Sequence, residues 1–255
     1  MAAGDCNACA PRQTSSQTIV REAAVFRFVM PVLGLSLVLG GLLASATAAT
    51  LTRPVVVELF TSQGCSSCPP ADALLRDLAQ NRADVLPLAF HVTYWNQLGW
   101  HDPYSLNAGT ARQASYNRLS AYGGSYTPQM VVDGRIDVVG SDRPAVIAAL
   151  RTAQPGPPIA LTLARDGSEV AIDLGAGVGE ARILLVGYDP EHRTTVPRGE
   201  NAGATLVEAN IVRDLQTIGA WRGAALHLRH LWPQGEHIAV LLQTSGGTFL
   251  AAGSL

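Results

Sequence analysis

Two cysteines, Cys65 and Cys68, stand three residues apart at the expected junction between a strand and a helix. The apolar, β-branched run over residues 55–60 predicts a buried strand, and residues 71–80 have the pattern of a helix. At such a junction the positive end of the helix dipole stabilises a thiolate. We expect Cys65 to be the exposed nucleophile, with a lowered pKa, and the more buried Cys68 to resolve the mixed disulfide. These residues predict thiol–disulfide chemistry.

The same pair could instead be an inert structural disulfide or part of a metal site. A disulfide that links residues so close in sequence closes too small a loop to constrain much of the unfolded chain, which disfavours a structural role. A metal site would need two more ligands. His91 and His101 are available, but a two-cysteine, two-histidine site usually has tighter spacing within each pair. We therefore expect no metal and no cofactor.

Two further features could complete a catalytic site. Thr127-Pro128 precedes another apolar run. Most X–Pro bonds in folded proteins are trans, but the surrounding pattern favours a cis bond here, which would present a backbone edge to an incoming polypeptide. Glu58 is an acid within the first predicted strand; if buried, it could relay a proton to or from Cys68. The alternative that we favour is that Glu58 faces solvent at a strand end or pairs with an arginine. The candidate catalytic residues are thus Cys65, Cys68, Pro128 and Glu58.

An aromatic segment over residues 91–103 contains His91, Tyr94 and Trp95. It could form one wall of a peptide groove near the cysteines, together with Thr127. It could equally be a local packing cluster over the helix that follows. The sequence favours neither interpretation.

The composition excludes several classes of function. The chain has 255 residues, 47% of them hydrophobic, and a formal net charge of −2, so it has no general attraction to nucleic acid or to anionic lipid. All 18 basic residues are arginine, which excludes a P-loop lysine, a Schiff-base lysine and a lysine general base. The expected partners are protein or small-molecule thiols and disulfides. The oligomeric state is left open.

Residues 1–49 have the order of a secretory signal peptide. Two arginines precede an apolar stretch centred on residues 32–43, and small residues follow up to residue 49. We expect this segment to be cleaved and the protein to be periplasmic or secreted; a retained membrane anchor is the alternative. Export allows disulfides to persist. Cys6 and Cys9 lie in this leader, so the mature chain would keep only the other two cysteines.

Two halves follow the leader. Residues 50–154 alternate in the order strand, helix, strand, helix, strand, strand, helix, which is the minimal order of a thioredoxin-like α/β domain. The proline- and glycine-rich residues 155–158 predict a stiff linker. Over residues 158–255 apolar residues alternate with period two in several short runs, which predicts an antiparallel, all-β, sandwich-like domain.

The residues around the cysteines resemble those of the bacterial DUF1223 family. The similarity is carried by residues 58–72, 91–103 and 126–129, and it extends to residues 198–201 and 210–213. The resemblance implies a secreted protein with a thioredoxin-like fold that carries the two cysteines. It implies no substrate, because the family was named for its unknown function.

Three functions fit these patterns. The first is a periplasmic or secreted thiol–disulfide oxidoreductase, which the isolated cysteine pair favours. The others are a non-catalytic thioredoxin-like binding module and a copper or other metal chaperone that uses the two thiolates. The direction of any redox reaction depends on small differences in thiolate stability, which the sequence does not fix.

Overall fold

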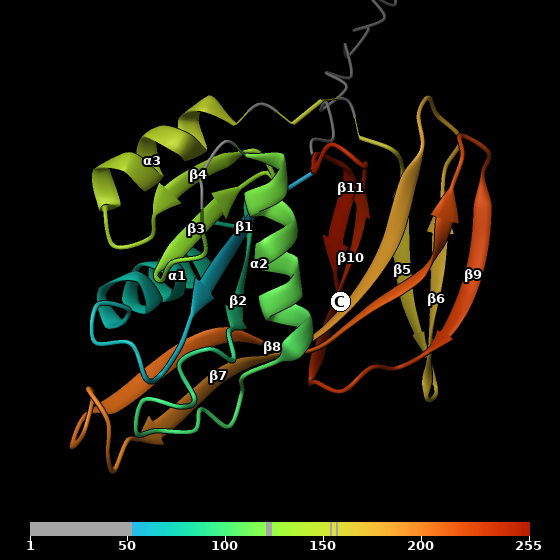
Figure 1. The fold of residues 1–255 in the computed structure, drawn as a ribbon. Helices are drawn as coiled ribbons and strands as arrows, with labels where there is room; N and C mark the ends of the chain where they lie inside the picture. Colours follow the sequence, from blue (N-terminus) through green and yellow to red (C-terminus); the bar gives the residue numbers. More distant parts are fainter. Residues whose placement is uncertain (1–52, 121–123, 154, 157) are drawn as a thin grey trace, which may run out of the picture. The chain divides into compact units, whose positions relative to one another are not determined.

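The computed structural model describes residues 53–120, 124–153, 155–156 and 158–255 (Figure 1). These residues belong to one compact unit, Ala48–Leu255. The expected leader over residues 1–49, including Cys6 and Cys9, lies outside the described residues. Within the described ranges, no helix is long and apolar enough to cross a membrane.

The described residues form three helices and eleven strands. In chain order they are β1 (Val55–Thr61), α1 (Pro69–Asn81), β2 (Val85–His91), α2 (Asn107–Leu119), β3 (Gln129–Val132), β4 (Ile136–Val139), α3 (Arg143–Thr152), β5 (Leu161–Asp166), β6 (Glu169–Leu174), β7 (Ala181–Thr195), β8 (Thr205–Trp221), β9 (Leu226–Leu231), β10 (His237–Gln243) and β11 (Phe249–Ser254).

Eight of these strands form one mixed sheet in the order β11-β10-β7-β8-β2-β1-β3-β4. β2 is parallel to both of its neighbours, β1 and β8. The other neighbouring strands of this sheet are antiparallel. β5, β6 and β9 form a separate antiparallel sheet of three strands.

The expectation of a thioredoxin-like α/β domain followed by a separate sandwich-like domain is wrong. The described protein is mostly β structure, and strands from both halves of the chain belong to one large mixed sheet. Apolar periodicity predicts that a segment is a strand, but it does not say which strand edges pair. Here the long strand β8 covers the edge of β2, so the C-terminal strands continue the sheet that the N-terminal half begins.

The join between the two halves is a short parallel contact, with Ala89 of β2 opposite Ile211 of β8. The preceding residue, Asn210, has a φ of 49°, a left-handed conformation that asparagine tolerates better than most residues. Its side-chain amide donates a hydrogen bond of 2.8 Å to the carbonyl of Pro87 in β2. This side-chain bond takes the place of a ladder bond and anchors β8 on β2.

Helices cover both faces of the sheet around β1 and β2, and both strands are buried along their whole length. Alternate residues of a strand point to opposite faces. Val55, Val57 and Leu59 accordingly pack with α1 and α3, whereas Val56 and Phe60 pack on the side of α2. Whether a residue of β1 packs with α1 and α3 or with α2 therefore depends on the face of the sheet to which its side chain points.

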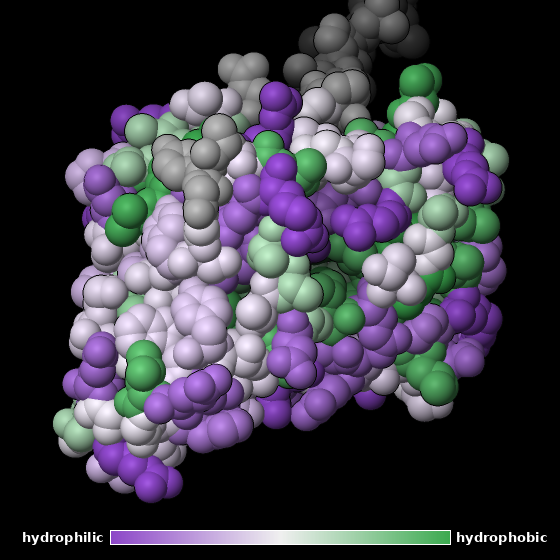
Figure 2. Space-filling model, viewed as in Figure 1, coloured by the Kyte–Doolittle hydropathy of each residue, from purple (hydrophilic) through white to green (hydrophobic). Residues whose placement is uncertain are grey.

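The small sheet packs against β7, β10 and β11 through a third apolar core. The largest buried member of this core, Trp221, donates its indole N–H to the carbonyl of Gly175 at 3.1 Å. On the face shown in Figure 2, apolar residues gather in a hollow between α2 and the small sheet. Elsewhere the small sheet carries exposed ion pairs, such as Arg229 with Asp166 at 2.5 Å.

We expect Asn210→Ala to lower the free energy of unfolding by about 2 kcal/mol, because alanine loses the hydrogen bond and adopts the left-handed conformation poorly. Asn210→Gly should cost about half as much, since glycine adopts this φ freely. Urea unfolding of the oxidised protein, followed by circular dichroism, measures both effects. Unchanged midpoints in both variants would show that the join does not depend on this residue.

Candidate disulfide site

Cys65 and Cys68 form a disulfide in the loop between β1 and α1, with their Cα atoms 5.4 Å apart. Cys68 is the N-cap of α1 and already has helical backbone angles, φ −79° and ψ −36°. Pro69 and Pro70 occupy the first turn of the helix, where a missing N–H costs no hydrogen bond. The junction predicted from the sequence therefore exists, and it holds the pair at the positive end of a helix.

Neither cysteine is exposed in this disulfide form; the exposed fraction is 0% for both. The expectation that Cys65 is exposed is therefore wrong for the oxidised protein. Ser66 and Ser67, between the two cysteines, are the exposed part of the ring. The Ser67 hydroxyl lies 3.3 Å from the Cys65 sulfur and 3.5 Å from the carbonyl oxygen of Thr127.

The connection between β7 and β8, residues 196–204, lies over the cysteine ring; we term it the cover loop. Its Glu200 carboxylate accepts a hydrogen bond of 3.0 Å from the backbone N–H of Ser66. The side-chain amide of Asn201 donates to the carbonyls of Gln63 and Cys65, at 2.9 and 3.0 Å. These hydrogen bonds hold the cover loop against the backbone on both sides of Cys65, so the loop covers the disulfide.

Three of the four predicted groove residues do meet beside this ring. Trp95 donates its indole N–H to the Thr127 hydroxyl at 2.8 Å, and its Cβ closely faces Gly64. Tyr94 is 37% exposed; burial raises its pKa, although hydrogen bonds to Gln113 and Thr127 oppose the rise. The Thr127-Pro128 bond is cis, as the sequence pattern predicted. These residues form a wall next to Ser67.

His91 does not belong to this wall. It lies in a buried cluster of ionisable side chains, which we term the carboxylate cluster: Asp72, His91, Asp102 and Glu208. His91 Nδ1 is 2.7 Å from Asp102 Oδ2. His91 Nε2 is 3.7 Å from Glu208 Oε1, and neither of these two atoms has a hydrogen-bond partner among the described residues.

Hydrogen bonds tie the carboxylate cluster to the loop that carries the cysteines. Gln63 donates its backbone N–H to Asp102 at 2.8 Å and its side-chain amide to Glu208 at 2.6 Å. Thr61, at the end of β1, donates its hydroxyl to Asp72 at 2.8 Å. Elements distant in sequence therefore converge at one buried point that is connected to the loop before Cys65.

The cluster shifts the pKa values of its members. Burial, reinforced by the charge of Glu208, raises the pKa of Asp72 to about 8. Burial alone would lower the pKa of His91, but the carboxylates of Asp102 and Glu208 outweigh it and raise this pKa to about 9. Burial raises the pKa of Glu208. Burial opposes ionisation of Asp102, yet the neighbouring His91 lowers its pKa overall.

Glu58, a candidate proton relay, lies elsewhere. It has the same parity in β1 as Val56 and Phe60, so it faces α2 rather than α1. It is fully buried and pairs with Arg112, whose NH2 lies 3.0 Å from its Oε2. The Tyr116 hydroxyl also donates to this carboxylate. The structure therefore agrees with the alternative favoured from the sequence, in which Glu58 pairs with an arginine.

Sequence reasoning missed Asp72, Asp102 and Glu208. Each carried a signal that was available: Asp72 stands one helical turn after Cys68, Asp102 lies in the same aromatic segment as His91, and Glu208 is an acid within an apolar strand. These signals were separate in the sequence. Only the sheet pairing of β8 with β2 brings Glu208 to the other two.

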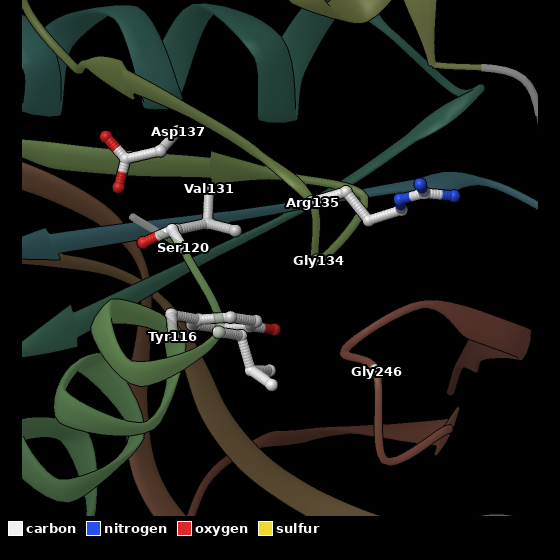
Figure 3. A pocket seen from close by; sticks show the side chains of 8 residues that line it. Tyr116, Ser120, Val131, Gly134, Arg135, Asp137 and Gly246 are labelled. Carbon is white, nitrogen blue, oxygen red and sulfur yellow. The ribbon is translucent and has the colours of Figure 1, made fainter. Parts of the chain in front are cut away.

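Of two similar-sized cavities in the described part of the chain, one lies near these residues. One of about 280 Å³ is beside the carboxylate cluster and is lined by Pro69, Asp72, Arg76, Thr205 and Glu208, among others. The other, of about 290 Å³, lies between the end of α2 and the turns of two hairpins, with Tyr116 and Ser120 on one side and Gly134 and Gly246 on the other (Figure 3). The second cavity has no residue of the disulfide site.

The described residues contain no group of three or more histidine, cysteine, aspartate or glutamate side chains arranged to hold a metal ion. In particular, His91 is engaged with Asp102, and His101 is exposed at the surface. The arrangement instead combines a disulfide with buried groups that can bind and release protons.

Comparisons place the chain among known proteins. The sequence profile described as "Protein of unknown function (DUF1223)" matches residues 56–243. A protein of Agrobacterium tumefaciens with a known crystal structure is 36% identical, with a TM-score of 0.70 and coverage of 81% of this chain and 96% of that one. HBP35 of Porphyromonas gingivalis has a TM-score of 0.55 at 11% identity, over 81% of this chain and 76% of that one, a likeness of fold alone. A comparison with curated proteins gave no match.

We expect Asn201→Ala to speed the reduction of the disulfide by dithiothreitol about 30-fold. The substitution frees the carbonyls of Gln63 and Cys65 from the cover loop, and losing two hydrogen bonds of about 1 kcal/mol each loosens the cover. Alkylation of the released thiols followed by mass spectrometry measures the rate. Asn81→Ala, which removes an exposed amide at the end of α1, is the control. A rate equal to wild type would show that the loop does not limit access.

The stability of the oxidised protein should fall as the pH rises from about 6.5 to 9. In the folded state His91 keeps its proton up to a pKa of about 9, whereas in the unfolded chain it loses this proton near pH 6.5. The free energy of unfolding therefore falls by roughly 3 kcal/mol across this window. Asp72 acts in the same direction up to about pH 8. Urea unfolding at several pH values tests this. His227→Asn, at an exposed site, should keep the decline, and a flat wild-type profile would contradict the assignment.

Proposed function

The chain belongs to the DUF1223 family, whose function is unknown, and we propose that its Cys65–Cys68 disulfide is a redox couple that exchanges with thiols of protein or small-molecule partners. The proposal is carried by one observation. A disulfide between residues three apart sits at the N-terminus of a helix and backs onto buried ionisable groups. Such a short loop adds little to stability, whereas the position suits a sulfur that must accept and release electrons.

The exchange would proceed in two steps. A partner thiolate attacks the Cys65 sulfur, the Cys65–Cys68 bond breaks, and Cys68 leaves with the electron pair as a thiolate. A second partner thiolate then attacks the partner sulfur of the mixed disulfide and releases the Cys65 thiolate. The partner is oxidised to a disulfide and the protein is reduced to a dithiol. The reverse sequence oxidises the protein, and the potential of the couple sets the direction.

The surroundings of the ring support selective exchange. Tyr94, Trp95 and Thr127 offer a wall with exposed aromatic surface and polar groups beside Ser67. The cover loop holds the opposite side through Glu200 and Asn201. A partner must displace this contact before it reaches the sulfur, so small solvent thiols would exchange slowly and a fitting partner quickly.

We also propose that the protein works in an oxidising compartment, as a periplasmic or secreted protein. The support is the order of charge, apolar stretch and small residues over residues 1–49. In such a compartment the oxidised pair would persist between encounters with its partner.

The burial of both sulfurs favours one other candidate, a binding module with an inert disulfide. The two proposals differ in the potential of the couple. A stable structural disulfide has a potential below about −300 mV, whereas an exchangeable pair lies above this value.

The test measures the reduction potential of the purified protein against glutathione, together with its turnover of a model dithiol. We expect a potential above about −300 mV and loss of turnover in Cys65→Ser. In Cys68→Ser we expect a trapped mixed disulfide, because the Cys65 thiolate can attack a partner disulfide but no Cys68 remains to resolve the product. Thr152→Ala, at an exposed helix end, is the control and should behave as wild type. A lower potential with no turnover would favour the binding module.

A further inference from the structure

The acid best placed to serve the disulfide is Asp72, one helical turn after Cys68. Its backbone N–H donates to the Cys68 carbonyl at 3.1 Å, so helical geometry extends from one residue to the other. Side chains four residues apart on a helix share a face, with Cβ atoms about 5–6 Å apart, and lean toward the N-terminus. The Asp72 carboxyl therefore leans back toward the Cys68 side of the ring.

Asp72 is fixed in a buried position rather than free at the surface. It is 5% exposed and accepts the hydroxyl of Thr61 from β1 at 2.8 Å. The charged groups that face it are Glu208 from β8, His91 from β2 and Asp102 from the loop after β2. On its own helix, Arg76 is occupied with the carbonyl of Val207 at 3.2 Å. No described cation forms an ion pair with the Asp72 carboxyl.

We infer that Asp72 is the acid that protonates the Cys68 thiolate when the disulfide is reduced, and the base that removes this proton when the disulfide re-forms. The inference rests on the proposed function of the pair. Glu208 and His91 act through Asp72 and are positioning residues, because their charges set how tightly it holds its proton. The cavity beside Asp72 and Glu208 gives the carboxyl a route to exchange protons with solvent.

The step balances as follows. When the partner thiolate attacks Cys65, Cys68 leaves as a thiolate, and the neutral Asp72 carboxyl gives up its proton to that sulfur. This leaves a Cys68 thiol and an Asp72 carboxylate, which takes a proton from water in the cavity. In the reverse direction, Asp72 carboxylate accepts the proton of Cys68 as its sulfur attacks the mixed disulfide. The pKa of Asp72, about 8, is close to that of a free thiol, so transfer in either direction is nearly balanced.

Glu58 cannot take this part. It lies on the opposite face of β1 from α1, and Arg112 and Tyr116 occupy its carboxylate. The alternation of side chains along β1 explains the different surroundings of the two buried acids. Thr61, which donates to Asp72, points to the same face of β1 as Leu59, whereas Glu58 points to the opposite face.

The experiment follows reduction of the full-length protein by dithiothreitol from about pH 6 to 9.5, corrected for the thiolate fraction of the reductant. Asp72→Asn should slow reduction about 100-fold near pH 6.5, the usual scale for loss of a general acid. The gap should close above about pH 9, where wild-type Asp72 has already lost its proton. Asp77→Asn, on the exposed side of the same helix, should match wild type throughout.

Glu208→Gln separates an acid–base role from a structural one. Removing the Glu208 charge should move the inflection of the wild-type profile to lower pH, which a mere loss of packing would not do. If Asp72→Asn fails to fold, the pH profile of Glu208→Gln by itself tests the acid–base role of Asp72. A constant Asp72→Asn rate ratio at every pH, or an unmoved inflection in Glu208→Gln, would overturn the inference. A wild-type disulfide that excess dithiothreitol does not reduce would instead refute the proposed function.

Discussion

The disulfide site depends on the place where β8 joins the edge of β2. Asn210 makes this join through its left-handed backbone and its bond to Pro87. Because a strand is stiff, fixing β8 at this point also fixes what precedes it. Glu208 lies two residues before Asn210 and enters the buried cluster behind the cysteines. The cover loop that carries Asn201 comes just before the strand and lies over Cys65.

Two buried acids, Glu58 and Asp72, have different roles because their neighbouring side chains differ. Glu58 has a complementary guanidinium and a hydroxyl, which satisfy its charge and make it part of the packing between β1 and α2. Asp72 has a hydroxyl donor but no ion-pair partner among the described residues, and it faces the carboxylate of Glu208. A buried acid that faces another acid has a raised pKa and holds a proton that it can give away.

The burial of the sulfurs and the proposed exchange are compatible because the cover is light. The cover loop holds the ring by a few hydrogen bonds to backbone groups. Contacts of this kind open at a small fraction of the free energy of global unfolding. Access to Cys65 then depends on how well a partner competes for the same backbone groups and for the wall formed by Tyr94 and Trp95.

Local features could be predicted from the residues alone: the strand–helix junction at Cys65 and Cys68, the cis bond before Pro128, and most of the helices and strands. These follow from short-range constraints such as side-chain periodicity, proline geometry and spacing in the chain. The sequence pattern failed on the fold class and on the covering of the disulfide, because strand edges are chemically alike and pairing is chosen by the whole molecule. Only the tertiary structure placed Glu208 beside Asp72, since the two residues share no local pattern and meet solely through the pairing of β8 with β2.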